Sequence, residues 1–462
     1  MKIFRNILAL AALVALFAIA VPRGYEAAGL VGAVTAFIIV NAFGFLAVDP
    51  RKALDGRARL TLSVSEILDD LIVSFTTEFP ILTKMGLDLR GTTLKKGKAE
   101  IAHITTLPTT STFNAASGGY GYGAQSARAL LADVSVTPDQ HPTCPLYWEH
   151  IDQISDDKNK YSEAIRLTGY VLVKGVIDNI LAGVTTRNFS KEVVIAVADM
   201  DYDGVAAVTT QANRQQMLPI GRVMIVSSAV AEVLDRDSRI TSKDYSGQQT
   251  GGKGIRAFKN VGGFELIQEY PDMPTNNGTA LTGVTIAAAG DLATKAAHGL
   301  ATGDPIIFSS LTGGAGLSTN TRYWAIVASA STFKIASTYA LAVAGTGIDI
   351  TTNYTDATVT LSENLIAFAF DKRAICVLAG IPDGFDSELM SQLNIPQVMG
   401  MVPTTEEQSG MTMAGVSWQE VGTGKLLFTP TFIWGKGLGR QAAAASTANV
   451  GTDYAGLRVV SS

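Results

Sequence analysis

The spacing of apolar residues predicts one long helix in the first half of the chain. Within 155–185, apolar side chains recur close to the helical period of about 3.6 residues, at Tyr161, Ile165, Leu172, Val176 and Ile180. Asp156 and Asp157 suit the positive N-terminal end of this helix, and Gly183 suits its C-cap. A helix over about 158–182 extends roughly 35–40 Å, which is long for a compact domain.

The residues before this helix predict an extended two-stranded arm. A basic turn that contains Lys95, Lys96 and Lys98 leads into a strand within 91–107, and a second strand is expected within 129–140. Between them, 114–127 is rich in Gly, Ser and Tyr, which predicts a flexible tip. A ribbon of two strands buries little apolar surface by itself, so we expect the arm to lie on a neighbouring molecule.

The middle of the chain alternates between helical and strand patterns. This alternation stops at 271–279 and resumes with the apolar run 364–380. The segments expected before the break are a helix at 204–217, a buried strand at 222–228, a short helix at 229–237 and a strand at 261–270.

The block between these two halves is rich in Thr, Ser, Ala and Gly. Its stretch 295–314 reads as strand, Gly turn and strand, which is typical of a small β module. Insertions succeed at exposed loops whose entering and leaving chains are close together, so we expect an all-β domain inserted into an α/β domain. Strand signals lie at Pro305–Phe308, Tyr323–Val327, Thr332–Ile335 and Ile348–Thr351.

The end of the chain alternates strands with glycine-rich segments. Within 415–439, the sequence GKGLG at 435–439 lacks the strand–helix context of a dinucleotide-binding loop, so a glycine turn between strands is expected there. A tail of small residues follows.

Composition narrows the class of protein. The chain has 462 residues, which is enough for two or three domains, and its formal net charge of -5 does not favour a polyanion-binding surface over the whole molecule. The two cysteines, Cys144 and Cys376, lie far apart in sequence, which argues against a disulfide framework and indicates a reducing compartment.

The N-terminus leaves two interpretations open. Ile7–Val21 has the length of a signal-peptide core, and Ala27–Val48 is long enough to cross a bilayer as a helix. These apolar runs are either buried or removed helices of a soluble protein, or they direct membrane insertion or export.

Two short motifs resemble ligand sites but lack essential residues. Gly247–Gly254 nearly matches a phosphate-binding loop, but Gly254 replaces the Ser or Thr that would bind magnesium. Asp199–Gly204 resembles the start of a calcium loop, but Thr210 occupies the position of the bidentate Glu, so a carboxylate-rich helix N-terminus is preferred. We therefore predict no catalytic, cofactor-binding or metal-binding residue, and no enzyme; a nucleotide-dependent enzyme would rest on Gly247–Gly254 alone.

The order of these elements resembles the major capsid protein of tailed bacteriophages, the HK97-like coat fold. Gly221–Pro274 carries most of the resemblance, with a buried strand, a helix that ends in Asp-Ser-Arg, a loop, and the strand sequence VGGFEL. The resemblance covers about 60–440 without the insertion, and it is one of pattern and order. It implies an α+β fold with a long spine helix, an extended β arm, a central α/β domain and an inserted small all-β domain.

The inserted block is similar in position to the extra β-rich domain of P22-like coat proteins. The apolar N-terminal runs depart from the family pattern, and they are a removed leader, an upstream reading frame fused to the coat sequence, or a membrane-associated feature. The resemblance implies this division: 1–50, hydrophobic N-terminal segment; 51–88, N-terminal arm; 89–140, β arm; 141–203, peripheral domain with the spine helix; 204–279 and 363–400, the two parts of the apical domain; 280–362, inserted domain; 401–462, return strands of the peripheral domain and tail.

The function implied by this resemblance is a coat protein. It would assemble through pentamers and hexamers into an icosahedral virion shell around double-stranded DNA, without sequence-specific contacts and without a cofactor. Its partners would be other copies of itself and scaffolding, portal and decoration proteins, with assembly in the host cytoplasm. The alternative is a membrane-anchored or exported β-rich surface protein. The residues expected to make assembly contacts are Lys95, Lys96, Lys98, Tyr120, Tyr122, Arg236 and Arg239.

Overall fold

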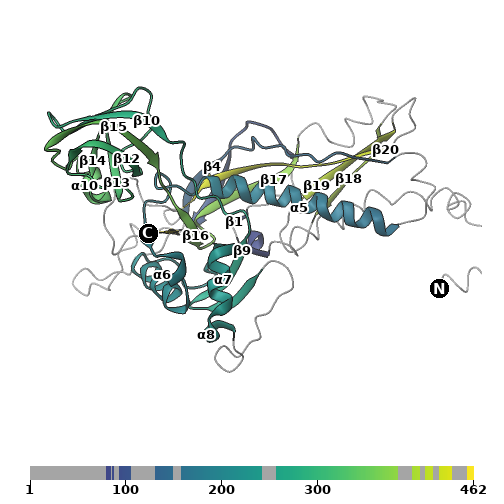
Figure 1. Ribbon diagram of the computed structural model, residues 1–462. Coiled ribbons are helices and arrows are strands. Elements are labelled where there is room, and N and C mark those ends of the chain that lie inside the picture. Colours follow the sequence, from purple (N-terminus) through teal and green to yellow (C-terminus); the bar gives the residue numbers. More distant parts are fainter. Residues whose placement is uncertain are drawn as a thin grey trace, which may run out of the picture.

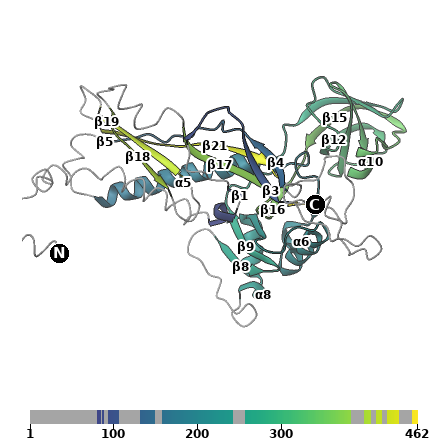
Figure 2. The ribbon, with the colours of Figure 1, turned by 180° about the vertical axis from the view of Figure 1, so that it is seen from behind.

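The computed structural model shows an α+β protein with three connected parts (Figures 1 and 2). A mixed sheet with helices forms the core, a closed barrel lies at one end, and an elongated limb extends from the other. The structure describes residues 80–84, 86–87, 93–105, 131–148, 158–241, 256–382, 398–405, 412–419, 426–439 and 455–461.

Several predicted features lie outside these ranges. They are the two apolar N-terminal runs, the tip of the arm with Tyr120 and Tyr122, and the glycine-rich loop 247–254. None of the helices in the described ranges combines the length and the apolar character needed to span a bilayer.

The core sheet has six strands, and its two faces are covered by different helices. Along β7 (Val223–Ser227), Val223 and Ile225 contact the cluster that contains α5 (Lys158–Ala182). Met224 and Val226 contact the cluster of the helices α6 (Tyr202–Arg214) and α7 (Ser228–Arg236). Successive residues of a strand point to opposite faces, so burial on both sides requires the uninterrupted apolar run observed here. The strand order is β6 (Glu192–Val194), β22 (Gly456–Val460), β16 (Leu365–Phe370), β7 (Val223–Ser227), β9 (Phe264–Tyr270) and β8 (Ala257–Val261).

The helices of the core follow the predicted segments. α6 spans Tyr202–Arg214 and α7 spans Ser228–Arg236, each within three residues of the expected bounds. The expected strand at 261–270 is confirmed over Phe264–Tyr270 (β9), but it begins later than expected, because Gly262 and Gly263 both have positive φ and form the turn between β8 and β9. A short helix, α8 (Ser238–Thr241), follows α7.

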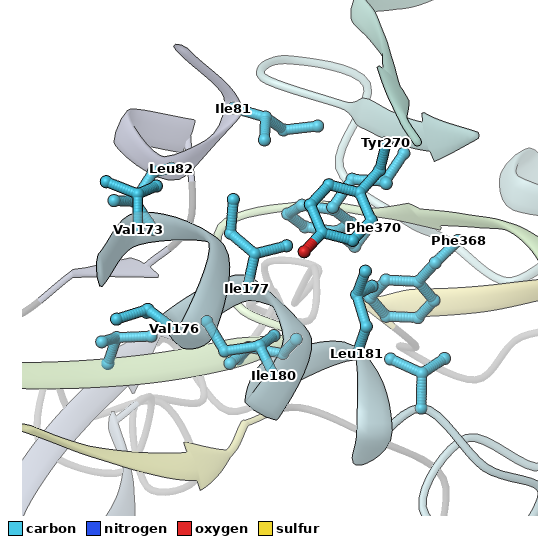
Figure 3. Close-up of a cluster of buried hydrophobic side chains, with 14 of the residues drawn as sticks. Ile81, Leu82, Val173, Val176, Ile177, Ile180, Leu181, Tyr270, Phe368 and Phe370 are labelled. Atoms are coloured by element: carbon cyan, nitrogen blue, oxygen red, sulfur yellow. The ribbon is translucent and has the colours of Figure 1, made fainter. Parts of the chain in front are cut away.

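Helix α5 has 25 residues, and its apolar stripe is buried as predicted where the structure describes it. Leu172, Val176 and Ile180 are at most 4% exposed, and they pack in one cluster with Phe368 and Phe370 of β16 (Figure 3). The N-terminal half of α5 extends away from the core, along the sheets of the limb (Figures 1 and 2).

The limb consists of α5 and two four-stranded sheets. One sheet pairs β17 (Ile375–Pro382) with β1 (Gly86–Leu87), β2 (Thr93–Leu94) and β21 (Ile433–Leu438). The other has the order β18 (Val398–Thr405), β19 (Thr412–Gln419), β20 (Leu426–Thr431) and β5 (Leu146–Trp148). A 3-10 helix, η1 (Pro80–Lys84), packs against α5, whereas η2 (Val197–Asp199) precedes α6.

The two predicted strands of the arm pair with each other as an antiparallel ribbon. β3 (Glu100–Thr105) and β4 (Leu131–Val136) are in register from Glu100 opposite Val136 to Thr105 opposite Leu131. Val136 and Ile104 are buried against Leu378 of β17. The root of the arm is therefore fixed to its own chain.

The first two glycines of GKGLG, Gly435 and Gly437, lie in strand β21, so the expected turn there is wrong. Gly439 directly follows this strand, and residues 134–138 cross closely over Gly435 and Gly437. A Cβ atom at Gly435 would lie 2.2 Å from the carbonyl oxygen of Thr137. Glycine is required because the arm approaches the strand too closely for any side chain.

The inserted block forms a closed six-stranded barrel between Leu281 and Leu361. Three of the four strand signals are correct, but the fourth, at Ile348–Thr351, precedes the strand that begins at Thr352. Residues 295–304 contain turns rather than the expected strand. The barrel order is β10 (Leu281–Ala287), β11 (Leu292–Thr294), β14 (Thr332–Ala336), β13 (Arg322–Ser329), β12 (Pro305–Ala315) and β15 (Thr352–Leu361), with a short helix, α10 (Tyr339–Val343), after β14.

Replacing Gly435 by Ala tests the contact between the arm and β21. We expect the variant to lose about 1–3 kcal/mol of unfolding free energy, because the new methyl group meets backbone that must move. The matched control is Gly175→Ala in α5, where a Cβ atom meets nothing within 4 Å and where we expect a gain of about 0.5–1 kcal/mol. Urea denaturation measures both; equal stability of the two variants would contradict the close crossing.

Candidate functional site

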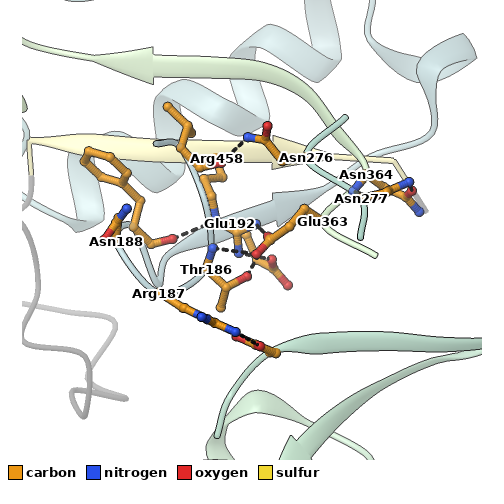
Figure 4. Close-up of polar contacts among 12 residues, drawn as sticks. Thr186, Arg187, Asn188, Glu192, Asn276, Asn277, Glu363, Asn364 and Arg458 are labelled. Atoms are coloured by element: carbon orange, nitrogen blue, oxygen red, sulfur yellow. Dashed lines mark hydrogen bonds and ion pairs between the residues drawn. The ribbon is translucent and has the colours of Figure 1, made fainter. Parts of the chain in front are cut away.

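The barrel is attached to the core through two connecting segments that lie side by side. The Asn277 side chain donates to Oδ1 of Asn364 at 2.9 Å, and the backbone N–H of Asn364 donates back to Asn277 Oδ1 at 2.9 Å. Nearby, the N–H of Gly278 donates to the carbonyl of Leu361 at 2.9 Å. These paired bonds join the entering and leaving chains at the neck of the barrel (Figure 4).

The neck is built around Arg458, whose side chain is fully buried. Its guanidinium donates to the carbonyl of Phe189 at 2.7 Å, to Glu363 Oε2 at 2.5 Å and to Glu192 Oε2 at 2.6 Å. Glu363 also accepts from the N–H of Thr186 at 2.9 Å and from its hydroxyl at 2.7 Å. Figure 4 shows these groups converging from the loop after α5, from β22 and from the end of the barrel.

Two ion pairs extend this network into the barrel. Arg187 binds Asp304 through two bonds, with Nε to Oδ1 at 2.9 Å and Nη2 to Oδ2 at 2.6 Å, and Asp304 is 1% exposed. Arg322 of β13 donates to Glu192 Oε2 at 3.0 Å, and its guanidinium lies 5.7 Å from the ring centre of Trp324. A bidentate pair fixes orientation as well as distance, so the barrel is held in one direction relative to the sheet.

The pKa values of Arg187, at the rim of the neck, and of Arg322, in its interior, are shifted in opposite directions. The hydrogen bonds to Asp304 raise the pKa of Arg187 above its ordinary value. Burial lowers the pKa of Arg322, and the charge of Glu192 partly offsets that effect. A guanidinium is protonated across the whole working pH range, so both arginines stay charged, and the interaction persists wherever the carboxylates are ionised.

The C-terminal end of α5 is joined to the same neck. The Asn276 side chain donates to the carbonyl oxygens of Leu181 at 2.9 Å and Val184 at 2.8 Å, which satisfies groups that a helix end leaves open. The hydroxyl of Tyr270, just before the connecting segment, donates to Asp178 Oδ1 at 2.5 Å. The helix of the limb and the neck of the barrel therefore form one connected unit.

The lysine-rich turn is exposed at the root of the arm. Lys95, Lys96 and Lys98 are all exposed, and the turn is closed by a bond from the N–H of Lys98 to the carbonyl of Lys95 at 3.1 Å. The N–H of Gly97 donates to the carbonyl of Pro138 at 2.9 Å. The three lysines therefore surround a fixed turn, and their role in assembly stays a prediction.

The two predicted arginines lie on the core, apart from the lysine turn. Arg236 is exposed on α7 and pairs with Glu232 one helical turn earlier. Arg239 pairs with Asp201, Asp203 and Asp237, and it lies over the ring of Tyr202. The structure brings neither arginine near the neck or the arm. Their contacts with other copies of the chain stay a prediction.

The carboxylates of the calcium-like motif have a structural role. Asp201 is the N-cap of α6 and accepts from the N–H groups of Asp203 and Gly204 at 2.9 and 3.1 Å. The hydrogen bond to Asp237 raises the pKa of Arg239. In the described part of the chain, no group of three His, Cys, Asp or Glu residues is placed to hold a metal ion.

Comparison with known proteins gives structural similarities but no sequence family. No family model and no curated protein matches the chain. It is similar to the capsid structure of the cyanophage P-SCSP1u, with 10% identity, a TM-score of 0.36, and coverage of 82% of this chain and 86% of that chain. A structure from Mycobacterium phage Che8 has 12% identity and a TM-score of 0.35, over 79% of this chain and 85% of that chain.

A third similarity is to the capsid of Staphylococcus phage Andhra, with 7% identity, a TM-score of 0.34, and coverage of 82% of this chain and 83% of that chain. These matches extend over most of the chain.

Replacing Arg458 by Met tests whether the neck depends on its buried charge. The substitution leaves Glu363, which is 1% exposed, without its cation, so we expect a loss of about 3–5 kcal/mol of unfolding free energy. Arg236→Met, which removes an exposed pair, is the control and should cost less than about 0.5 kcal/mol. Calorimetry or urea denaturation compares them, and a small loss for Arg458→Met would count against the network.

A second substitution separates attachment of the barrel from stability of the core. Arg187→Met should speed amide exchange at Gly278 and Leu365 by about fivefold, because their bonds at the neck open more often. Amides inside the barrel, such as Ile348, whose N–H donates to the carbonyl of Ile335 at 2.7 Å, should keep their rates. Arg214→Met, an exposed arginine at the end of α6, is the control, and an unchanged rate at both neck amides in Arg187→Met would refute the coupling.

Proposed function

We propose that this chain is the major capsid protein of a tailed bacteriophage, which assembles through pentamers and hexamers into an icosahedral shell. The observation that carries the proposal is the outward face of α5. The small and apolar residues exposed on this face are Ala164, Leu167, Val171, Gly175 and Ala182, and the partly exposed Lys174 and Asp178 pair with each other beside them. Leu167 is 58% exposed and Val171 is 55% exposed.

A helix that is apolar on both faces is normally buried on both faces. In α5 one face is covered by the core of the same chain, so the other face is suited to a surface supplied by another copy. The limb along which α5 lies exposes a further large apolar side chain: Tyr147, on the edge strand β5, is 61% exposed. Repeated contacts between identical copies add up in a closed shell, even where each contact is weak.

The resemblance in the order of elements, described above for the sequence, supports the same assignment. In this proposal the arm lies across the adjacent subunit, α5 serves as the spine of the peripheral domain, and the barrel is an insertion comparable to that of P22-like coat proteins. The shell would enclose double-stranded DNA without base-specific contacts and would be assembled in the host cytoplasm. Scaffolding, portal and decoration proteins are the partners expected for such a shell.

Electron microscopy of the purified, size-fractionated chain tests the proposal directly. We expect closed particles tens of nanometres across, or discrete pentamers and hexamers. A folded monomer that never assembles would contradict the coat function and favour the exported β-rich surface protein instead.

The outward face of α5 gives a sharper test. The double substitution Leu167→Glu and Val171→Glu should leave the monomer folded, because both side chains are largely exposed, but reduce the assembled fraction by about tenfold or more through desolvated like charges. Ala207→Glu, on an exposed position of α6, is the matched control for added charge. Light scattering and circular dichroism follow assembly and folding, and normal assembly of the double variant would overturn this role of α5.

A further inference from the structure

The neck contains the only Asn-Gly pair in the sequence, Asn277 and Gly278. Asn277 is exposed, and the pair lies in the segment that leads from the core into the barrel. A glycine has no side chain to shield its backbone nitrogen, so this nitrogen reaches the side-chain amide carbon of a preceding asparagine more easily than in any other pair. The pair is therefore the position of the chain most open to attack by its own backbone.

The structure explains why both residues are present. The Asn277 side chain donates to Oδ1 of Asn364 and accepts from the backbone N–H of Asn364, which needs a side chain that both donates and accepts. A Cβ atom at residue 278 would lie 2.9 Å from Cβ of Leu361, so glycine fits there without displacing the leaving segment. The attachment of the barrel thus places a reactive pair at an exposed position.

The same attachment opposes the reaction while the neck is closed. The N–H of Gly278 donates to the carbonyl of Leu361 at 2.9 Å, and the two bonds with Asn364 hold the Asn277 amide in place. The Gly278 bond must break and the Asn277 side chain must rotate before the nitrogen can reach the amide carbon. The reaction therefore requires local opening of the neck.

We propose that Asn277 is a deamidation site, and that opening of the neck sets its rate. The backbone nitrogen of Gly278 bonds to Cγ of Asn277 and loses its proton, and the side-chain nitrogen leaves as ammonia, which forms a succinimide ring. Water then adds to either ring carbonyl and breaks its bond to the ring nitrogen, which gives aspartate or isoaspartate. One water is consumed and one ammonia is released, without any oxidant or reductant.

The isoaspartate product changes the attachment of the barrel in one direction. In this product the main chain runs through the former side chain and gains one methylene group before Gly278. The N–H of Gly278 is then displaced from the carbonyl of Leu361, and the bond from the N–H of Leu365 to the carbonyl of Thr275 is weakened with it. This chemistry takes place within one chain and does not depend on shell formation.

Peptide mapping by mass spectrometry of the full chain, incubated under mildly alkaline conditions, tests the proposal. In concentrated urea, where sequence alone decides, Asn277 should convert at least about tenfold faster than Asn320, an exposed asparagine that precedes the β-branched Thr321. In the native chain, Asn277 should still convert, but about tenfold more slowly than in urea, because the bonds of the neck must open first.

Two variants test the control by the neck. Arg187→Met should raise the native rate at Asn277 about fivefold and leave the rate in urea unchanged, whereas Arg214→Met should change neither. Asn364→Gly removes the acceptor of the Asn277 amide, keeps a residue that tolerates the φ of 43° at 364, and should also raise the native rate severalfold.

Isoaspartate is identified by its enzymatic methylation, and the separated isoaspartyl form should exchange the amide of Leu365 about fivefold faster than the fresh chain. No conversion at Asn277 in the native chain, or equal rates in the native chain and in urea, would overturn the proposal. An unchanged native rate in both Arg187→Met and Asn364→Gly would also overturn it, because the neck would then not control the reaction.

Discussion

A fully buried guanidinium is the constraint on which the arrangement of this protein depends. Arg458 lies inside a sheet strand, where its charge is tolerated because two carboxylates and a backbone carbonyl accept all of its bonds. These acceptors come from distant parts of the chain: the loop after α5, the strand β6 and the last residues before β16. The buried charge thus fixes where the helix ends, where the barrel is attached and where the C-terminal strand is inserted.

The neck also explains how a protein with such different modules keeps one geometry. The barrel has its own apolar core, and the sheet with its helices has two more. Apolar packing alone would allow these modules to turn relative to one another, because it has little directionality. The ion pairs of Arg187 and Arg322 supply that direction, since each requires a specific alignment of planar groups.

Local patterns identified most of the elements, and long-range contacts account for the errors. The apolar spacing of Leu172, Val176 and Ile180 requires only a helix period, so α5 was predictable from sequence. The role of Gly435 was not, because it depends on Thr137 and Pro138, which directly follow strand β4 and cross above it. The strand β22 was missed for the same reason: its five residues follow a tail of small residues, and only the partners β16 and β6 make them the interior of a sheet.

The neck site was equally hidden, although one signal was present. Arg458 interrupts a short apolar run, which indicates a charge that must find a partner when that run is buried. The identity of the partners, Glu363 and Glu192, follows only from the three-dimensional arrangement. The expected assembly contacts stay a prediction, because such contacts form only with a neighbouring molecule.

The charge balance at the neck has a consequence for the history and the engineering of this fold. The paired groups number three cations, Arg187, Arg322 and Arg458, and three anions, Glu192, Glu363 and Asp304. The barrel contributes one of each sign, so a chain without the barrel would keep two cations and two anions. The segments that enter and leave the barrel also lie in contact at the neck. The charges of the neck are therefore balanced with or without the barrel, so one inserted domain can be exchanged for another without leaving a buried charge behind.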